Sequence, residues 1–212
     1  MTTLQYRRMN IPIVYEDNWL LVVNKPSGLL TIPAGQKQRR TLVKILNEDL
    51  KNKGLSYRLH PCHRLDKETS GLIIFAKGKS IQKIMMQEFK ERRVAKTYLA
   101  LVYGKLSRKQ ARICNPILGR SALTRYRVVK ILSDFSVVKI WPLTGRKNQI
   151  RLHFKQIGHP ILGEDKFAFR RDFKIKAKRL CLHAQGLDFS HPVTKKQIYL
   201  KAGLPEYFKK FL

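Results

Sequence analysis

The sequence is poor in acidic residues, and this scarcity is its most informative feature. Only 14 of the 212 residues are Asp or Glu, against 44 Lys and Arg, so the formal net charge is +30 at pH 7. So basic a chain repels itself unless a polyanion neutralises it, which makes nucleic acid the first partner to consider. The cations recur between folded-looking segments, at 37–40, 90–93, 105–109 and 170–179. We therefore expect a basic surface carried on a fold, with a solvated basic face that binds nothing as the alternative.

Cysteines and long apolar runs are also scarce. The three cysteines, Cys62, Cys114 and Cys181, are an odd number and contain no C-x-x-C pair, which favours reduced thiols over a disulfide framework. Residues 1–10 lack the apolar core of a signal peptide, and nowhere do about 18 apolar residues run together. We expect a cytoplasmic protein that is neither exported nor membrane-spanning.

Hydrophobic periodicity predicts a chain that mixes strands and helices. Alternating or compact apolar runs predict strands over 11–15, 19–24, 71–76, 97–103, 125–132, 135–141, 180–189 and 197–202. Helical spacing predicts helices over 41–50, 80–91 and 148–156. Thr41 is placed to cap the first helix and Gly54 to end it, and we expect Met85 and Met86 to fill core space. No linker or repeat is evident, so we expect one domain.

A polar segment over 60–71 precedes a compact apolar strand, which is a natural position for a functional loop. Zinc ligation by His60, Cys62 and His63 is disfavoured, because adjacent positions point in different directions and no second ligand pair has a usual spacing. A nucleophilic pair of Cys62 and His63 is equally weak, because no third group is indicated to orient it.

The two carboxylates of this segment allow further interpretations. Asp66 and Glu68 are conceivable as a glycosidase-like pair, although the basic surface favours a phosphodiester polymer over a neutral sugar. Alternatively, His63 and Asp66 only stabilise the turn before Gly71. The local pattern alone leaves a structural and a catalytic Asp66 about equally supported.

Several separate motifs resemble the RluA branch of the RNA pseudouridine synthases. The segment His63-Arg64-Leu65-Asp66, with Thr69-Ser70-Gly71 after it, resembles the catalytic signature of that family. Further similar segments follow the family order, at 24–28, 96–98, 143–146, 149–153, 158–163 and 179–192. The resemblance covers roughly 11–208, so we identify the chain as a member of the family.

The resemblance implies a fold and an activity. We expect an α+β fold, with an N-terminal extension at 1–10 and one catalytic domain at 11–212, in which helices flank a mixed, largely antiparallel sheet with a central RNA-binding cleft. The implied activity isomerises specific uridines to pseudouridine in rRNA, tRNA or both, on a base flipped out of its stack. No metal, redox cofactor or other small molecule is implied. The RNA is the expected partner, and a monomer is the default state.

The resemblance also implies roles for catalytic residues. Asp66 matches the family nucleophile. Arg151 matches the arginine that pairs with this aspartate, where a bidentate fork would keep the carboxylate charged and oriented. Tyr98 matches the tyrosine that lies against the target base, and its service as the base that removes the C5 proton is a hypothesis.

Four further residues are implied in RNA contact. Arg64 matches the arginine that fills the space left by the flipped base. We expect His63, Arg146 and Gln149 to contact RNA as well. The other interpretations are a turn-stabilising salt bridge for Arg64, a phosphate-bound surface residue for Arg151 and an ordinary core aromatic for Tyr98.

Two departures from the family pattern remain. Lys147 and Asn148 stand where members commonly carry Thr or Ser followed by His, which leaves the details of RNA contact open. Only about ten residues precede the first predicted strand, so we expect a short form without the S4 RNA-binding domain of many relatives. The rival interpretations are a catalytically silent RNA-binding or ribosome-assembly protein of the same fold, and a nuclease or another kind of tRNA-modifying enzyme.

Overall fold

The computed structural model describes residues 3–6, 9–33, 40–168, 175 and 177–212. The chain forms two compact units. Unit 1 comprises Met1–Ala95 and Gly186–Gly203, and unit 2 comprises Lys96–Gln185 and Leu204–Leu212. Among the described residues, no helix combines the length and the apolar character needed to cross a membrane.

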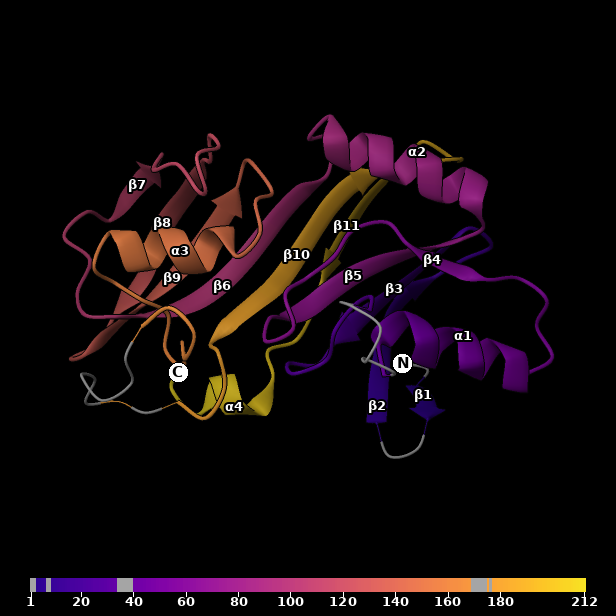
Figure 1. Cartoon of the computed structure of the whole chain (residues 1–212), viewed down its shortest axis with the longest axis horizontal. Coiled ribbons are helices and arrows are strands. Elements are labelled where there is room, and N and C mark those ends of the chain that lie inside the picture. Colours follow the sequence, from indigo (N-terminus) through magenta and orange to yellow (C-terminus); the bar gives the residue numbers. More distant parts are fainter. Residues whose placement is uncertain (1–2, 7–8, 34–39, 169–174, 176) are drawn as a thin grey trace. The chain divides into compact units, whose positions relative to one another are not determined.

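Unit 1 is built on antiparallel strands (Figure 1). β1 pairs with β2, β2 with β3 and β3 with β5, while the short β4 also pairs with β5. The bounds are β1 Thr3–Tyr6, β2 Met9–Glu16, β3 Leu20–Lys25, β4 Leu59–Pro61 and β5 Ser70–Lys77. In addition, β10 (Leu182–Ser190) pairs through its second half with β11 (Gln197–Lys201). The helices of unit 1 are α1 (Leu42–Asn52) and α2 (Lys79–Lys90).

Strand β5 is the most buried element of unit 1. Its residues from Leu72 to Ala76 have no exposed surface, and because successive side chains point to opposite faces, both faces of the strand are covered. Its register with β3 runs from Leu20 opposite Ala76 to Lys25 opposite Gly71. The pairing therefore places Lys25 at the end of β5 where the segment carrying Asp66 enters the strand.

Helix α1 follows the local rules that its sequence indicates. The Thr41 hydroxyl accepts the backbone N–H of Lys44 at 3.4 Å, as expected of an N-cap. Gly54 ends the helix with a φ of +71°, and the N–H groups of Gly54 and Leu55 donate to the carbonyls of Lys51 and Leu50. These two bonds form the Schellman motif, so the predicted start and end are both confirmed.

Helix α2 separates two neighbouring methionines. Met85 is fully buried, whereas Met86 is 52% exposed. Successive residues of a helix are turned by about 100° around its axis, so only one of the two faces the core. The prediction of core packing is confirmed for Met85 and wrong for Met86.

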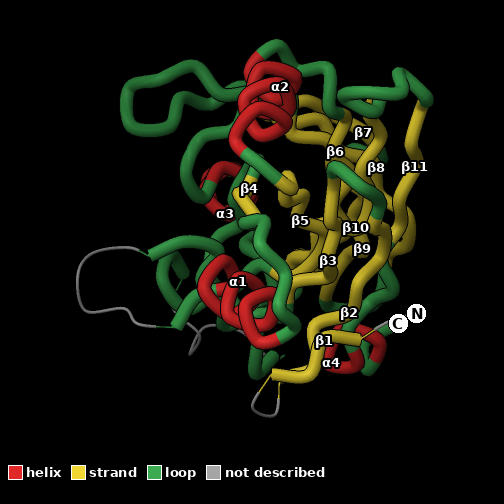
Figure 2. The backbone as a smooth tube through the Cα atoms, turned by 90° about the vertical axis from the view of Figure 1, so that its right-hand side faces the viewer, coloured by secondary structure: helices red, strands yellow, loops and turns green. Residues whose placement is uncertain are grey.

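Unit 2 is a second set of antiparallel strands. They lie in the order β6, β9, β8, β7, with bounds Ala95–Tyr103, Phe135–Pro142, Thr124–Ile131 and Gln110–Ile113. Helix α3 (Gln149–Gln156) lies on one face of these strands, as both views show (Figures 1 and 2), and α4 (Glu206–Lys209) follows β11. Phe154 of α3 is fully buried, with its ring centroid 5.6 Å from that of Tyr126 in β8.

Antiparallel strands with few helices confirm the predicted α+β class. Every predicted strand and helix is present, with ends that differ by at most two residues. Four elements of three or four residues, β1, β4, β7 and α4, were not predicted, because they are too short to show a period.

Candidate active site

The segment that carries Asp66 is a tight turn between β4 and β5. Its Leu65 side chain is buried, whereas Arg64 is exposed and Asp66 half-buried. The Thr69 N–H donates to the Asp66 carbonyl at 3.1 Å and closes a β-turn with Asp at its first position. The buried leucine thus anchors the loop, and its polar neighbours turn toward the surface of the unit.

Thr31 holds the same loop from a distant part of the chain. Its hydroxyl donates to the Leu65 carbonyl at 3.2 Å and accepts the Leu65 N–H at 3.3 Å. Both backbone groups of the residue just before Asp66 are therefore satisfied by one side chain that is itself 1% exposed.

Lys25 adds a second anchor. Its side chain is fully buried, and Nζ donates to the carbonyls of Pro26, Leu29 and Lys67 at 2.9, 2.7 and 3.1 Å. Burial lowers the pKa of Lys25 to about 7, although the carboxylates of Glu68 and Asp66 act to raise it. One side chain therefore ties the turn after β3 to the residue that follows Asp66.

The turn at 26–28 makes two further bonds to the Asp66 segment. The Ser27 hydroxyl donates to the Glu68 carbonyl at 2.7 Å, and the Gly28 N–H donates to the Lys67 carbonyl at 2.9 Å. Gly28 has a φ of +86°, a conformation that other residues rarely adopt. These contacts give the Lys-Pro-Ser-Gly sequence a structural purpose, which is to hold the segment that carries Asp66.

Neighbouring histidine and cysteine side chains face the protein. His63 Nε2 accepts the Ile74 N–H at 3.1 Å, and its ring lies 4.4 Å from that of Phe89 between centroids. Burial raises the pKa of the Cys62 thiol to about 12, so it is not a thiolate at neutral pH. The described side chains include no group of three or more that could hold a metal ion. The hydrogen bond from Ile74 to His63 supports the loop.

Arg151 lies on α3, with only 5% of its surface exposed. Its Nε and Nη2 donate to Oε2 and Oε1 of Glu164 at 2.7 and 2.6 Å, which is a bidentate ion pair. Nη1 also donates to Asn148 Oδ1 at 3.4 Å, and the guanidinium lies over the Phe167 ring at 4.9 Å. These contacts fix the plane of the guanidinium.

Glu164 is a supporting residue that the sequence motifs did not reveal. It is 2% exposed, and its Oε1 also accepts the N–H groups of Lys166 and Phe167 at 3.0 and 3.3 Å. Burial acts to raise the pKa of this carboxyl, but its bonds with Arg151 and the two N–H groups outweigh burial and lower it. Glu164 is therefore a carboxylate at neutral pH.

The glycine before Glu164 gives the local signal for this geometry. Gly163 has a φ of +78°, and a Cβ atom there would collide with the Arg179 carbonyl. Only a residue without a side chain lets the chain turn so close to another backbone. The segment 158–163, which resembles a family motif, ends one residue before Glu164, the carboxylate that this turn positions.

Asn148 explains part of the departure from the family pattern. It precedes α3 in the left-handed conformation, with a φ of +56°, which Asn adopts more readily than most residues. Its side chain contacts Arg151, as described above. The unusual asparagine thus both starts the helix and contacts the guanidinium.

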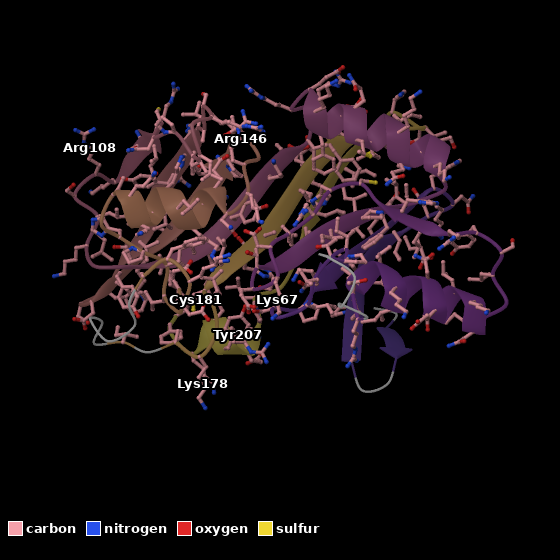
Figure 3. The ribbon with its side chains drawn as sticks, in the orientation of Figure 1. Lys67, Arg108, Arg146, Lys178, Cys181 and Tyr207 are labelled. Carbon is pink, nitrogen blue, oxygen red and sulfur yellow. The ribbon has the colours of Figure 1, made fainter. Side chains whose placement is uncertain are left out.

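Gln149 and Arg146 have different surroundings, although both were predicted to contact RNA. Gln149 is 4% exposed: its amide donates to the Leu123 carbonyl and to Thr124 Oγ1, both at 3.0 Å, and accepts from Thr144 Oγ1 and the Arg146 N–H. These hydrogen bonds stabilise the turn before α3. Arg146, labelled in Figure 3, is exposed in that turn. Its Nε donates to the Ser121 carbonyl at 3.0 Å.

Tyr98 lies on β6, half-buried and packed against the core of unit 2, directly opposite Ile140 of β9. Asp66 belongs to unit 1, whereas Tyr98 and Arg151 belong to unit 2. The described contacts therefore bring together Lys25 with the Asp66 loop in one unit, and Arg151 with Asn148 in the other.

Comparison with known proteins covers both units. A family model described as RNA pseudouridylate synthase matches residues 19–156. The chain is 38% identical over 208 residues to the dual-specificity RNA pseudouridine synthase RluA of Haemophilus influenzae, covering 91% of this chain and 92% of that protein. It is 31% identical to the tRNA pseudouridine synthase C of the same species, covering 95% and 96%. The solved structure of human RNA Pseudouridylate Synthase Domain Containing 4 is similar with a TM-score of 0.78 at 25% identity, over 93% of this chain and 90% of that chain.

The match of the family model spans the Asp66 loop, Tyr98 and Arg151 together. The alignments with these relatives cover nearly the whole length of each relative, so the similarity is not confined to one short motif. The chain belongs to the RNA pseudouridylate synthase family.

Proposed function

We propose that this isomerase converts specific uridines to pseudouridine in ribosomal RNA, transfer RNA or both, with Asp66 as its nucleophile. The observation that carries the proposal is the family match across Asp66, Tyr98 and Arg151. Relatives whose names specify ribosomal or transfer RNA align with most of the chain, and the +30 charge suits a polyanionic substrate.

The reaction itself limits what the protein must supply. The N1–C1′ bond breaks, the uracil turns, and a C5–C1′ bond forms, while C5 loses a proton and N1 gains one. Atoms and electrons balance without an oxidant or reductant. The protein must provide a nucleophile for the sugar or the ring, a group that moves the C5 proton, and a surface that retains the detached base.

Asp66 can act as the nucleophile only while it is ionised. A free Asp has a pKa of about 3.9, but RNA that covers the loop would remove water from the carboxylate and raise its pKa. In the proposal, Arg151 donates to Asp66 in the RNA complex and opposes that rise. A guanidinium carries five N–H donors, so Arg151 can serve Asp66 while Glu164 fixes its plane.

Tyr98 is proposed to stack on the target base, and Arg64 to fill the space that the flipped base leaves in the RNA. A tyrosine ring that stacks on a base contributes about 1–3 kcal/mol, and this is the role proposed for Tyr98. Arg64 is exposed beside Asp66 in the chain, so its guanidinium is accessible to fill the gap in the RNA stack. Arg146, also exposed, is proposed to bind phosphate, whereas His63 and Gln149 are proposed as supports.

The test uses unmodified transcripts of ribosomal RNA and of a tRNA mixture. After incubation with the purified protein, digestion to nucleosides and mass spectrometry should reveal pseudouridine in at least one of them, and sequencing of the modified positions identifies the target. Conversion should persist in EDTA, because the proposal involves no metal or cofactor, and with protein that elutes as a monomer.

A catalytically silent RNA-binding protein is the alternative. It would bind the same transcripts, since the basic surface suffices for that, and leave every uridine unchanged. Tight, salt-sensitive binding without pseudouridine in any transcript would favour this alternative and overturn the proposal.

A further inference from the structure

One face of the unit 2 strands carries cations that the proposed reaction does not use. In β8, Tyr126 points toward α3, where it meets Phe154, so its neighbours Arg125 and Arg127 point to the opposite face. Both arginines are exposed. Figure 2 shows α3 on one side of β7 and β8. The two arginines point to the opposite side.

The strand registers extend this face into two rows. Arg112 of β7 lies opposite Arg125, which lies opposite Trp141 of β9. In the second row, Arg127 lies between Gln110 of β7 and Lys139 of β9. We call the set the cationic sheet face: Gln110, Arg112, Arg125, Arg127, Lys139 and Trp141.

On this face, two pairs of directly opposed residues each bring two positive charges together. Arg112 faces Arg125, and Arg127 faces Lys139, an arrangement that destabilises a sheet unless something neutralises it. Asp134 is the only acidic residue in the sequence from 92 to 163, and β7, β8 and β9 contain none. No ion pair found among the described residues involves these four cations.

Trp141 holds two of the cations in place. The Arg125 guanidinium lies 5.8 Å and the Lys139 ammonium 5.6 Å from the centroid of its ring. Such cation–π contacts restrict the motion of long side chains that would otherwise be free in solvent. Arg125 and Lys139 therefore present positive groups in preferred positions, which suits the regularly spaced phosphates of a nucleic acid.

This face is distinct from the side that carries the proposed base-stacking residue. Tyr98 lies directly opposite Ile140, whereas Lys139 and Trp141 flank Ile140 and point to the other face. A stem-loop that presents its uridine to Tyr98 therefore does not cover the cationic sheet face. Only RNA that extends beyond that stem-loop can reach both.

We propose that the cationic sheet face is a second RNA-binding surface, which holds the phosphate backbone of RNA outside the stem-loop that contains the target uridine. The inference rests on the proposed function for its substrate class. It implies that long RNA is bound more tightly than the isolated stem-loop, through contacts that have no part in the chemistry.

The experiment compares wild-type protein with the triple variant R125Q/R127Q/K139Q. For long RNA, the KM should rise about tenfold, and the slope of log binding constant against log salt should become shallower by about 3, one for each lost phosphate contact. The kcat and the KM for the isolated stem-loop should stay within about twofold of wild type, because Tyr98, Asp66 and Arg151 are unchanged. Urea unfolding should show little change in stability, because the variant loses the contacts of Arg125 and Lys139 with Trp141 but also removes like-charge pairs.

The matched control is K79Q/K83Q/K90Q, which removes the same charge from exposed positions of α2. It should leave the ratio of the two KM values as in wild type. If the sheet-face variant keeps that ratio too, or if both variants change it equally, the inference is wrong. Should wild-type protein modify no RNA, the proposed function fails, and the salt slope of long-RNA binding still decides whether the sheet face binds RNA.

Discussion

The loop that carries Asp66 and the helix that carries Arg151 are held by different interactions. The loop is anchored by several hydrogen bonds to its backbone groups, from Lys25, Ser27, Gly28 and Thr31. Arg151 forms a buried, bidentate ion pair with Glu164. Distributed hydrogen bonds lose little when one is removed, whereas a buried ion pair leaves an uncompensated charge when one partner is lost. The Arg151 side should therefore be the more fragile.

Glu164→Ala should have the largest effect on stability. It leaves the buried Arg151 without its bidentate partner, and we expect the free energy of unfolding to fall by about 3–5 kcal/mol. Urea denaturation measures this change, with Glu206→Ala as the control, because the Glu206 side chain is 82% exposed and its ion pair is weak. Equal stability of the two variants would contradict the comparison.

Lys25→Met tests the loop anchor through its pH dependence. The pKa of Lys25 is about 7 in the folded protein, below its ordinary value of 10.5. Between these values the unfolded chain binds the proton and the folded chain does not, so this group makes wild-type stability rise with pH from about 7 to about 10. The methionine variant lacks the rise and loses about 2–3 kcal/mol from unsatisfied carbonyls.

The measurement is the difference in unfolding free energy between wild type and Lys25→Met across that pH range. Taking the difference cancels the titration of the buried thiols and other lysines. Lys67→Met, on the exposed side of the same loop, should show no such trend. A difference that stays constant with pH would show that Lys25 keeps its proton when folded.

Arg151→Lys tests the proposed pairing of Arg151 with Asp66 during the reaction. Lysine keeps the charge but not the planar fork, so Asp66 should ionise less readily beneath RNA. The acid limb of the single-turnover rate should move to higher pH by about one unit. An acid limb identical to that of wild type would contradict the proposed pairing of Arg151 with Asp66.

Asn148 should give the smallest effect. Asn148→Ala places a residue in the left-handed conformation that it disfavours and removes the contact with Arg151, at an expected cost of about 1–2 kcal/mol. Asn148→Gly removes the contact without the backbone strain and should cost less. Thermal unfolding of the two variants separates these contributions, and a glycine variant less stable than the alanine one would exclude the backbone explanation.

The sequence predicted the Asp66 side better than the Arg151 side for a physical reason. Thr41 and Gly54 act within their own helix, and the strand after Asp66 is one apolar run, so local patterns suffice. Glu164 meets Arg151 from 13 residues away through a turn whose geometry no periodicity encodes. The hydrogen bonds of Gln149 to its neighbours were likewise not visible in its motif, which indicates that a residue is constrained but not what constrains it.

The central claim is that Asp66 performs the isomerisation, and tritium release from RNA labelled at uridine C5 tests it most directly. Forming pseudouridine must expel the C5 hydrogen, so wild-type protein should release tritium to water. Asp66→Asn, nearly identical in size, should abolish release while leaving RNA binding intact, and Asp134→Asn, an exposed acidic residue, should match wild type. Equal release by Asp66→Asn and wild type would contradict the account.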